Sequence, residues 1–141
     1  MVTKYLGLDL GTKTLGIAYS DALGFVHGVE TLKFDKNQYV VARKRVIQLV
    51  EQMGINHIVL GLPLHLSGEK SEMSDVCLRF RDDLLKENPN LVIEMMDERL
   101  SSVTANKSIS ERGMNHQQRK DNVDRIAACI ILDTFLRMKG Y

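Results

Sequence analysis

The hydrophobic period changes once along the chain, and this change constrains the fold more than any other feature. In the first part of the sequence, apolar and polar residues alternate in three segments separated by short turns, a pattern that predicts β-strands over residues 4–10, 15–21 and 25–34. Beyond residue 38 the apolar positions follow a helical spacing, interrupted by short apolar runs at 57–63 and 91–96. These two runs are predicted to be buried strands.

Helical spacing and end signals predict four helices, over residues 38–53, 71–87, 101–111 and 122–138. Gly54 stands where the first helix needs a left-handed C-cap, and Asn88-Pro89 ends the second. Ser101 is the expected N-cap of the third helix. The polar segment 112–120, which contains a glycine, is predicted to be a loop.

The predicted element order is β-β-β-α-β-α-β-α-α, which defines an α/β fold. Strands joined by hairpins and then by helices indicate a mixed five-stranded sheet with helices on both faces. The 141 residues have the size of one domain, residues 1–141, and an apolar content of 44% is enough to form a core.

Charge and composition exclude several classes of protein. The net charge is +1, so nucleic acid would have to bind through local basic patches. No apolar run has membrane-spanning length and no signal peptide is present, so we expect no membrane association. Cys77 and Cys129 form no CxxC pair, and we expect reduced core cysteines in a cytoplasmic protein.

An aspartate interrupts the apolar face of the first strand, in the stretch LGLDLGTKTLGIAYSD at residues 6–21. Because side chains alternate along a strand, the leucines share one face while Asp9 shares the other with Gly7 and Gly11. A buried carboxylate is costly unless it is paired or binds a metal. Asp9 is therefore a candidate functional residue.

Two further acids, Glu98 and Asp124, come from separate predicted elements, and spacing alone does not show that they cluster with Asp9. Glu98 follows the run 91–96, and Asp124 opens the last helix. Active sites of open α/β sheets lie at the carboxyl ends of strands, and clustered carboxylates suit Mg²⁺. From spacing alone, a residue such as Glu98 is more often part of a surface turn than of a site, and one such as Asp124 is more often a charge favoured by the helix dipole.

Four blocks of the sequence together resemble one known family. They are LGLDLGTKTLGIAYSD, IVLGLPLHLSG, DERLSSVTA and VDRIAACIILDTFL, which span residues 6–136. They resemble the YqgF family of Holliday junction resolvases and pre-16S rRNA nucleases, which have an RNase H-like fold.

The resemblance implies metal-dependent hydrolysis of phosphodiester bonds. Its three acids correspond to Asp9, Glu98 and Asp124 here, as catalytic residues and as ligands of Mg²⁺ or Mn²⁺, with two ions expected. It favours Glu98 over the neighbouring Asp97, and it implies that glycines beside Asp9 let metal and phosphate approach.

Asp121, three residues before Asp124, has two interpretations. It is either the N-cap of the last helix or a fourth carboxylate at the site, because residues three apart share a helix face. We expect the cap.

Five basic residues are predicted to bind nucleic acid, namely Lys13, Arg99, Arg112, Arg119 and Lys120. Alternatives remain open, since Lys13 fits an ordinary exposed turn and Arg99 could instead orient Glu98. Few aromatic residues are available for stacking, which favours recognition of shape and backbone. His65 and His116 have no partner at the spacing of a zinc site.

The sequence thus predicts a nuclease for structured nucleic acid, acting in 5′-end processing of pre-16S rRNA, in Holliday junction resolution, or in both. One alternative is a non-catalytic adaptor in transcription or ribosome assembly. Another is an actin-like ATP-binding module, because DLGTKT resembles its first phosphate motif, but such proteins close two domains over ATP. The sequence leaves a monomer and a homodimer equally open.

Overall fold

The structure is a computed structural model that describes residues 2–103 and 116–141, without the side chains of residues 116–121. Its strands are β1 (Tyr5–Leu10), β2 (Thr14–Ser20), β3 (Val26–Lys33), β4 (His57–Leu62) and β5 (Val92–Asp97). Its helices are α1 (Tyr39–Met53), α2 (Glu72–Glu87), the short 3₁₀ helix η1 (Glu98–Leu100) and α4 (His116–Met138).

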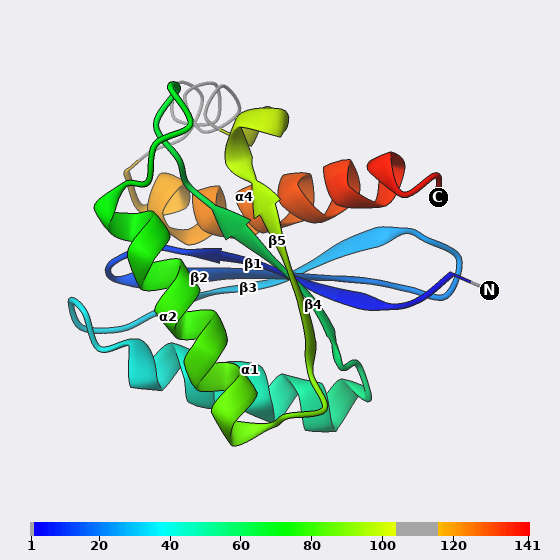
Figure 1. Cartoon of the computed structure of the whole chain (residues 1–141). Helices are drawn as coiled ribbons and strands as arrows, with labels where there is room; N and C mark the ends of the chain where they lie inside the picture. Colours follow the sequence, from blue (N-terminus) through cyan, green and yellow to red (C-terminus); the bar gives the residue numbers. More distant parts are fainter. Residues whose placement is uncertain (1, 104–115) are drawn as a thin grey trace.

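The five strands form one mixed sheet in the order β3-β2-β1-β4-β5. The hairpin-linked strands β1, β2 and β3 pair antiparallel, whereas β4 pairs parallel with both β1 and β5. Figure 1 shows α4 on one side of the sheet and α1 and α2 on the other. The predicted α/β fold with helices on both faces is confirmed.

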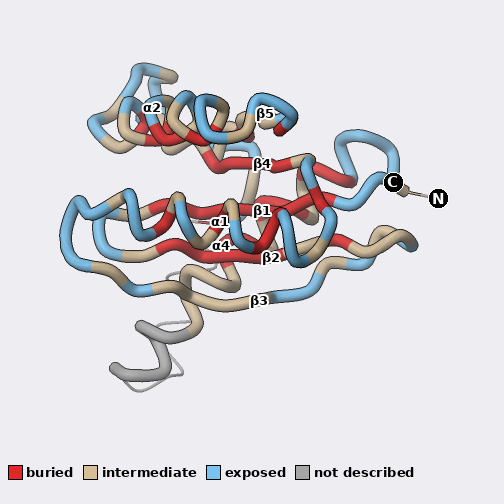
Figure 2. Tube along the Cα trace, turned by 90° about the horizontal axis from the view of Figure 1, so that it is seen from below, coloured by how far each residue is buried: buried red, intermediate tan, exposed pale blue. Residues whose placement is uncertain are grey.

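The face covered by α1 and α2 is packed through large apolar side chains. Leu6, Leu8 and Leu10 of β1 belong to one core cluster with residues of both helices, such as Val46 and Phe80. The central strands are the most buried, and β3 at the sheet edge is largely half-exposed, as the red and tan tubes of Figure 2 show. This face supplies most of the apolar burial that stabilises the fold.

In the described part of the chain, α4 is the helix that covers the opposite face. Ala127, Ala128, Ile131 and Leu132 are buried there against β1, β2 and β4. A Cβ atom added to Gly7 would lie only 2.8 Å from the Cβ of Leu132. The helix therefore lies directly on the sheet backbone, because the strands present small residues to it.

The helix ends agree with local sequence signals where those signals are strong. Gly54 adopts the left-handed conformation (φ 64°) after α1, as predicted. Ser71 caps α2 through a reciprocal pair of hydrogen bonds with Ser74, and the helix ends at Asn88. None of the described helices is long and apolar enough to cross a membrane.

The last helix begins earlier than predicted. Because α4 starts at His116, the loop prediction is wrong for residues 116–120, and Asp121 lies inside the helix rather than at its N-cap. This first turn is polar on all sides, but its glutamine, arginine and lysine residues are favourable helix formers. Residues 112–115 lie outside the described part of the chain.

The helix predicted over residues 101–111 is described only at its start. The 3₁₀ turn at Glu98–Leu100 comes first, and the hydroxyl of Ser101 then accepts the N–H of Val103 at 3.4 Å, as an N-cap would. Residues 104–111 lie outside the described residues.

Candidate functional site

Asp9 lies at the centre of the sheet between two glycines on neighbouring strands. Its Cα partner in β2 is Gly16. In β4, Gly61 follows Leu60, the partner of Leu8, and so flanks Asp9 on the other side. Asp9 is only 6% exposed and points to the α4 face, as alternation predicted. Glycine on both sides lets groups from other elements come close to the sheet beside this carboxylate.

Gly16, the β2 partner of Asp9, lets the backbone of α4 at Asp124 come close to the sheet. A Cβ atom on Gly16 would lie 1.8 Å from the backbone oxygen of Asp124, so the α4 backbone touches β2 there. The next N–H along the helix, that of Arg125, donates to the hydroxyl of Thr31 at 3.1 Å. Thr31 is the β3 partner of Gly16. The row Asp9–Gly16–Thr31 across three strands therefore fixes the position of Asp124.

Gly61 lets Glu98 come close to the sheet in the same way. The chain turns sharply into η1 after β5, and a Cβ atom on Gly61 would lie 2.9 Å from the Oε1 atom of Glu98. The Glu98 carboxylate therefore lies over β4, the strand adjacent to that of Asp9. Asp124 and Glu98 approach Asp9 from opposite sides.

The buried thiol of Cys77 lies close enough to two of these acids to be affected by their charge. Burial, and then the negative charges of Glu98 and Asp9 in that order of size, raise the pKa of Cys77 in α2 to about 12. Both carboxylates therefore act on one location at the same edge of the sheet. The thiol itself stays protonated at neutral pH and is not a nucleophile.

The neighbour of Glu98 has a different partner. The Asp97 carboxylate accepts the guanidinium of Arg99 at 2.6 Å and the Arg99 backbone N–H at 2.9 Å, and the pairing lowers the pKa of Asp97. Arg99 also donates from Nη1 to the backbone oxygen of Leu66 at 3.3 Å. Asp97 thus holds the turn together while Glu98 faces β4, which agrees with the choice of Glu98 over Asp97.

The donor set suits a divalent metal. All three acids offer carboxylate oxygens, the ligands that Mg²⁺ and Mn²⁺ prefer, and the two flanking glycines let those oxygens approach the sheet. Within the described residues, however, no three Asp, Glu, His or Cys side chains are already arranged to hold one ion. The structure places the acids around one edge, and their role as ligands stays a prediction.

The structure describes only some of the other predicted site residues. Lys13 is exposed in the β1–β2 turn, and Arg99 follows β5 at the same edge of the sheet. Arg112 lies outside the described residues. Arg119, Lys120 and Asp121 lie on α4, but their side chains are outside the description. Asp121 is nearly one helical turn before Asp124, so a role as a fourth acid stays a prediction.

Of the two glycines beside Asp9 in sequence, Gly7 does not open the site, and the expectation for Gly11 stays a prediction. The expectation for Gly7 is wrong, because Leu132 and the backbone oxygen of Ala128 cover it. Near Gly11, an added Cβ would meet the Thr14 hydroxyl at 3.1 Å. The residues that sequence reasoning missed, Gly16 and Gly61, carried a usable signal, since a glycine inside a strand often marks a close approach.

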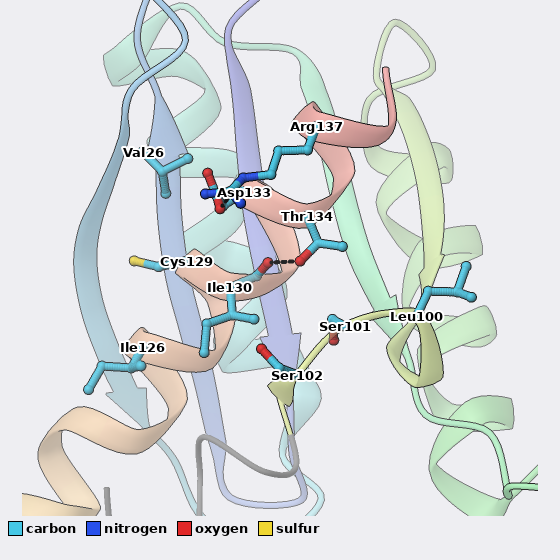
Figure 3. A pocket seen from close by; sticks show the side chains of 10 residues that line it. All are labelled: Val26, Leu100, Ser101, Ser102, Ile126, Cys129, Ile130, Asp133, Thr134 and Arg137. Carbon is cyan, nitrogen blue, oxygen red and sulfur yellow. Dashed lines mark hydrogen bonds and ion pairs between the residues drawn. The ribbon is translucent and has the colours of Figure 1, made fainter. Parts of the chain in front are cut away.

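One cavity of about 820 Å³ lies apart from the three acids. It runs along α4 opposite η1 and the start of β3, and Figure 3 shows the side chains that line it. Some of its polar groups pair within the wall: Asp133 pairs with Arg137 at 3.0 Å, and the Thr134 hydroxyl donates to the Ile130 carbonyl oxygen at 2.7 Å. It offers no reactive constellation.

Comparison with solved structures confirms the fold. The structure of Thermus thermophilus RuvC in complex with a Holliday junction substrate superposes with a TM-score of 0.61, covers 97% of this chain and 96% of that one, and shares 12% identity. A second Thermus thermophilus RuvC structure gives a TM-score of 0.59 at 11% identity, covering 97% of each chain. The fold is that of the RuvC-like resolvases, which are RNase H-like.

Comparison at the sequence level shows the family. Residues 3–138 match the family described as "RuvX: Holliday junction resolvase". A protein of Bacillus cytotoxicus named "Putative pre-16S rRNA nuclease" is 36% identical over 137 residues, which are 96% of this chain and 99% of that protein. A protein of the same name from Bacillus thuringiensis has the same identity and coverage. The chain therefore belongs to the RuvX family, also called YqgF, and is a hydrolase of the nuclease class.

Proposed function

We propose that this protein cleaves phosphodiester bonds of structured RNA in a metal-dependent reaction, and that its substrate is a precursor of 16S rRNA. The observation that carries the proposal is the glycine-flanked Asp9, with Glu98 over one glycine and Asp124 over the other. The relatives named as pre-16S rRNA nucleases support the choice of substrate, because they match over nearly their whole length.

The three acids would hold Mg²⁺ or Mn²⁺, and we propose two ions. Bound there, the metal would lower the pKa of the attacking water and offset the charge on the leaving oxygen. Asp9, buried in the sheet, provides a fixed carboxylate with little solvent around it. Glu98 and Asp124 come from elements that approach Asp9 from either side, and we propose that their carboxylates serve the same phosphate position.

Binding rests on local positive charge. Lys13 and Arg99 stand at the edge where β1 and β5 end, and we propose that Arg112, Arg119 and Lys120 extend the same basic rim. With a net charge of only +1, the protein would bind phosphates through this rim rather than through a general field.

The test compares two substrates under one set of conditions. The wild-type protein is incubated with a 16S rRNA precursor and with a four-way DNA junction in Mg²⁺, in Mn²⁺ and in excess chelator. We expect cleavage of the RNA in either metal and none in chelator. Asp124→Asn should abolish cleavage, whereas Asp133→Asn, two turns along the same helix and paired with Arg137, should not.

A different pattern would change the proposal. Cleavage of the junction in preference to the RNA would favour the resolvase activity in the family's description, and two symmetric cuts would then call for a homodimer. Binding without cleavage of either substrate would favour the adaptor. We further propose a cytoplasmic location, which suits the two free cysteines and the relatives' names.

A further inference from the structure

A second cavity, of about 550 Å³, is lined by the turn that follows β1, the strand of Asp9, and contains none of the three acids. It opens between the β1–β2 turn, the loop before α1 and the first turns of α2. Thr12, two residues after the end of β1, forms part of its wall and is the neighbour of Lys13 in the turn. The cavity therefore lies at the edge of the sheet where β1 ends, on the side of α1 and α2, whereas the acids lie on the α4 side of the same edge.

The aromatic wall of the cavity is held in place by its surroundings. Asn37, in the left-handed conformation (φ 65°), donates its backbone N–H to the Thr12 carbonyl oxygen at 2.8 Å. The Tyr39 hydroxyl donates to the Asn37 side-chain oxygen at 3.1 Å, and its ring packs edge-on against Phe34 at 6.0 Å between centroids. Partial burial raises the pKa of Tyr39, so the hydroxyl stays protonated. The ring is thus positioned before any ligand arrives.

The remaining walls combine apolar surface with hydrogen-bond acceptors and one cation. Met73 and Val76 of α2 are half-buried against the core, and Glu72, Asp75 and Arg79 of the same helix line the cavity with exposed side chains. None of these three charged side chains makes a hydrogen bond or an ion pair with another residue in the described part of the chain. The helix dipole accounts for acids in a first turn but not for the tyrosine and arginine that face them.

This chemistry fits a nucleobase better than a phosphate. Two carboxylates repel phosphate, but they accept N–H groups from the edge of a base. A tyrosine ring and a guanidinium plane both stack on base faces. Guanine presents two adjacent N–H donors on its Watson–Crick edge, which suits neighbouring carboxylates. The volume lies within the range of small-ligand pockets.

We propose that this cavity binds an unpaired base of the substrate strand next to the cleaved phosphate, with a preference for guanine. Tyr39 and Arg79 stack on the base, and Glu72 and Asp75 accept its N–H groups. The inference rests on the proposed nuclease function. A smaller hollow of about 140 Å³ shares Tyr39 and Arg79 with this cavity and continues along α2.

The experiment measures binding in chelator, where no cleavage occurs. The probe is a short, fluorescently labelled oligouridine, with or without a single guanine at successive positions, and the readout is anisotropy. We expect one guanine position to tighten binding about tenfold over the all-uridine strand, and Tyr39→Leu to remove roughly that factor. Tyr39→Phe, which keeps the ring, should bind like the wild type.

Single substitutions of the two carboxylates test how each contributes to the guanine preference. Glu72→Gln and Asp75→Asn should each reduce the preference for guanine to about twofold or less, within the range of one lost hydrogen bond. Asp82→Asn removes the same charge from an exposed site on α2 outside the cavity and should leave the preference unchanged. These changes lie at exposed positions, so folding is retained even if Tyr39→Leu disturbs the packing on Phe34.

Two results would overturn the inference. One is a strand affinity that does not depend on base identity, and the other is a guanine preference that survives Glu72→Gln and Asp75→Asn together. Cleavage of the rRNA precursor in Mg²⁺, measured on the same variants, keeps this failure separate from a failure of the proposed function. If the wild-type protein shows no base preference but still cleaves the precursor, the inference about the cavity fails and the proposed function stands.

Discussion

The two faces of the sheet are packed by different means. On the α1 and α2 face, side chains such as Leu8 and Ile17 fill the space between sheet and helices. On the α4 face, the strands offer Gly7, Gly16 and Gly61, and the helix or a side chain touches the sheet backbone directly. The first face is stabilised by buried apolar side chains. On the second, the absence of side chains at the glycines lets other elements come close to the strand backbone.

This difference explains where the acids stand. A carboxylate among the leucines would lose its hydration with nothing to replace it. On the glycine face, Asp9 has neighbours without side chains, so backbone and acid groups from distant segments come within its reach. Adjacent residues of β1 therefore belong to different parts of the molecule, Leu8 to the core and Asp9 to the site.

The largest expected effect is on the glycine face. Asp9→Asn should reduce the cleavage rate by roughly a thousandfold or more, about 4 kcal/mol of transition-state stabilisation, because an amide binds a divalent cation poorly. Its unfolding free energy in chelator should be unchanged or higher, since one of several nearby negative charges is removed. Single-turnover cleavage and urea unfolding of the same preparation measure both. Wild-type cleavage by this variant would contradict the assignment of the acids.

The next residue toward the N-terminus should behave in the opposite way. Leu8 is fully buried, so Leu8→Ala should lower the free energy of unfolding by about 3 kcal/mol through lost burial and a cavity. The cleavage rate per folded molecule should stay near that of the wild type. Loss of cleavage by Leu8→Ala without loss of stability would contradict the view that this face serves stability and the α4 face serves catalysis.

A single added methyl group tests the glycine face directly. Gly16→Ala should lower the unfolding free energy by about 2 kcal/mol, because the new Cβ would overlap the Asp124 backbone oxygen and move α4. Cleavage should also fall, since Asp124 moves with the helix. Gly11→Ala is the matched control, because its Cβ would meet only the Thr14 hydroxyl, a side-chain atom that can rotate away. Equal stability losses in both variants would contradict the close contact at Gly16.

Much of the fold could be predicted because its signals are local. Alternation placed β1 to β3 within a residue or two, and Gly54 and Asn88 marked the ends of α1 and α2. The start of α4 could not be predicted in this way, because residues 116–120 have helix-favouring side chains but no apolar stripe to reveal the period.

The candidate site depended on non-local information. The acids were named through the resemblance of four sequence blocks, since spacing left each with an ordinary structural role. The neighbours of Asp9 follow from strand register, which pairs it with Gly16 and sets it beside Gly61. The cavity wall joins Thr12, Tyr39 and Arg79, which come together only when three separate elements have packed.

The smallest expected effect concerns the turn between β5 and η1. There Asp97 pairs with Arg99, whereas Glu98 lies over β4 beside Asp9. Arg99 pairs with Asp97 and holds its pKa below the ordinary value of 3.8, so the pair contributes stability above that pH and loses it as the pH falls through the lowered pKa. Arg99→Gln should therefore return the Asp97 pKa toward 3.8 and remove a small stabilisation at neutral pH, with none left to remove in strong acid. Carboxyl-carbon NMR titration follows Asp97, and Arg81→Gln, which disrupts an exposed pair with Asp82, should leave that titration unchanged. An Asp97 pKa unmoved by Arg99→Gln would show that backbone hydrogen bonding, rather than the guanidinium, holds this turn in place.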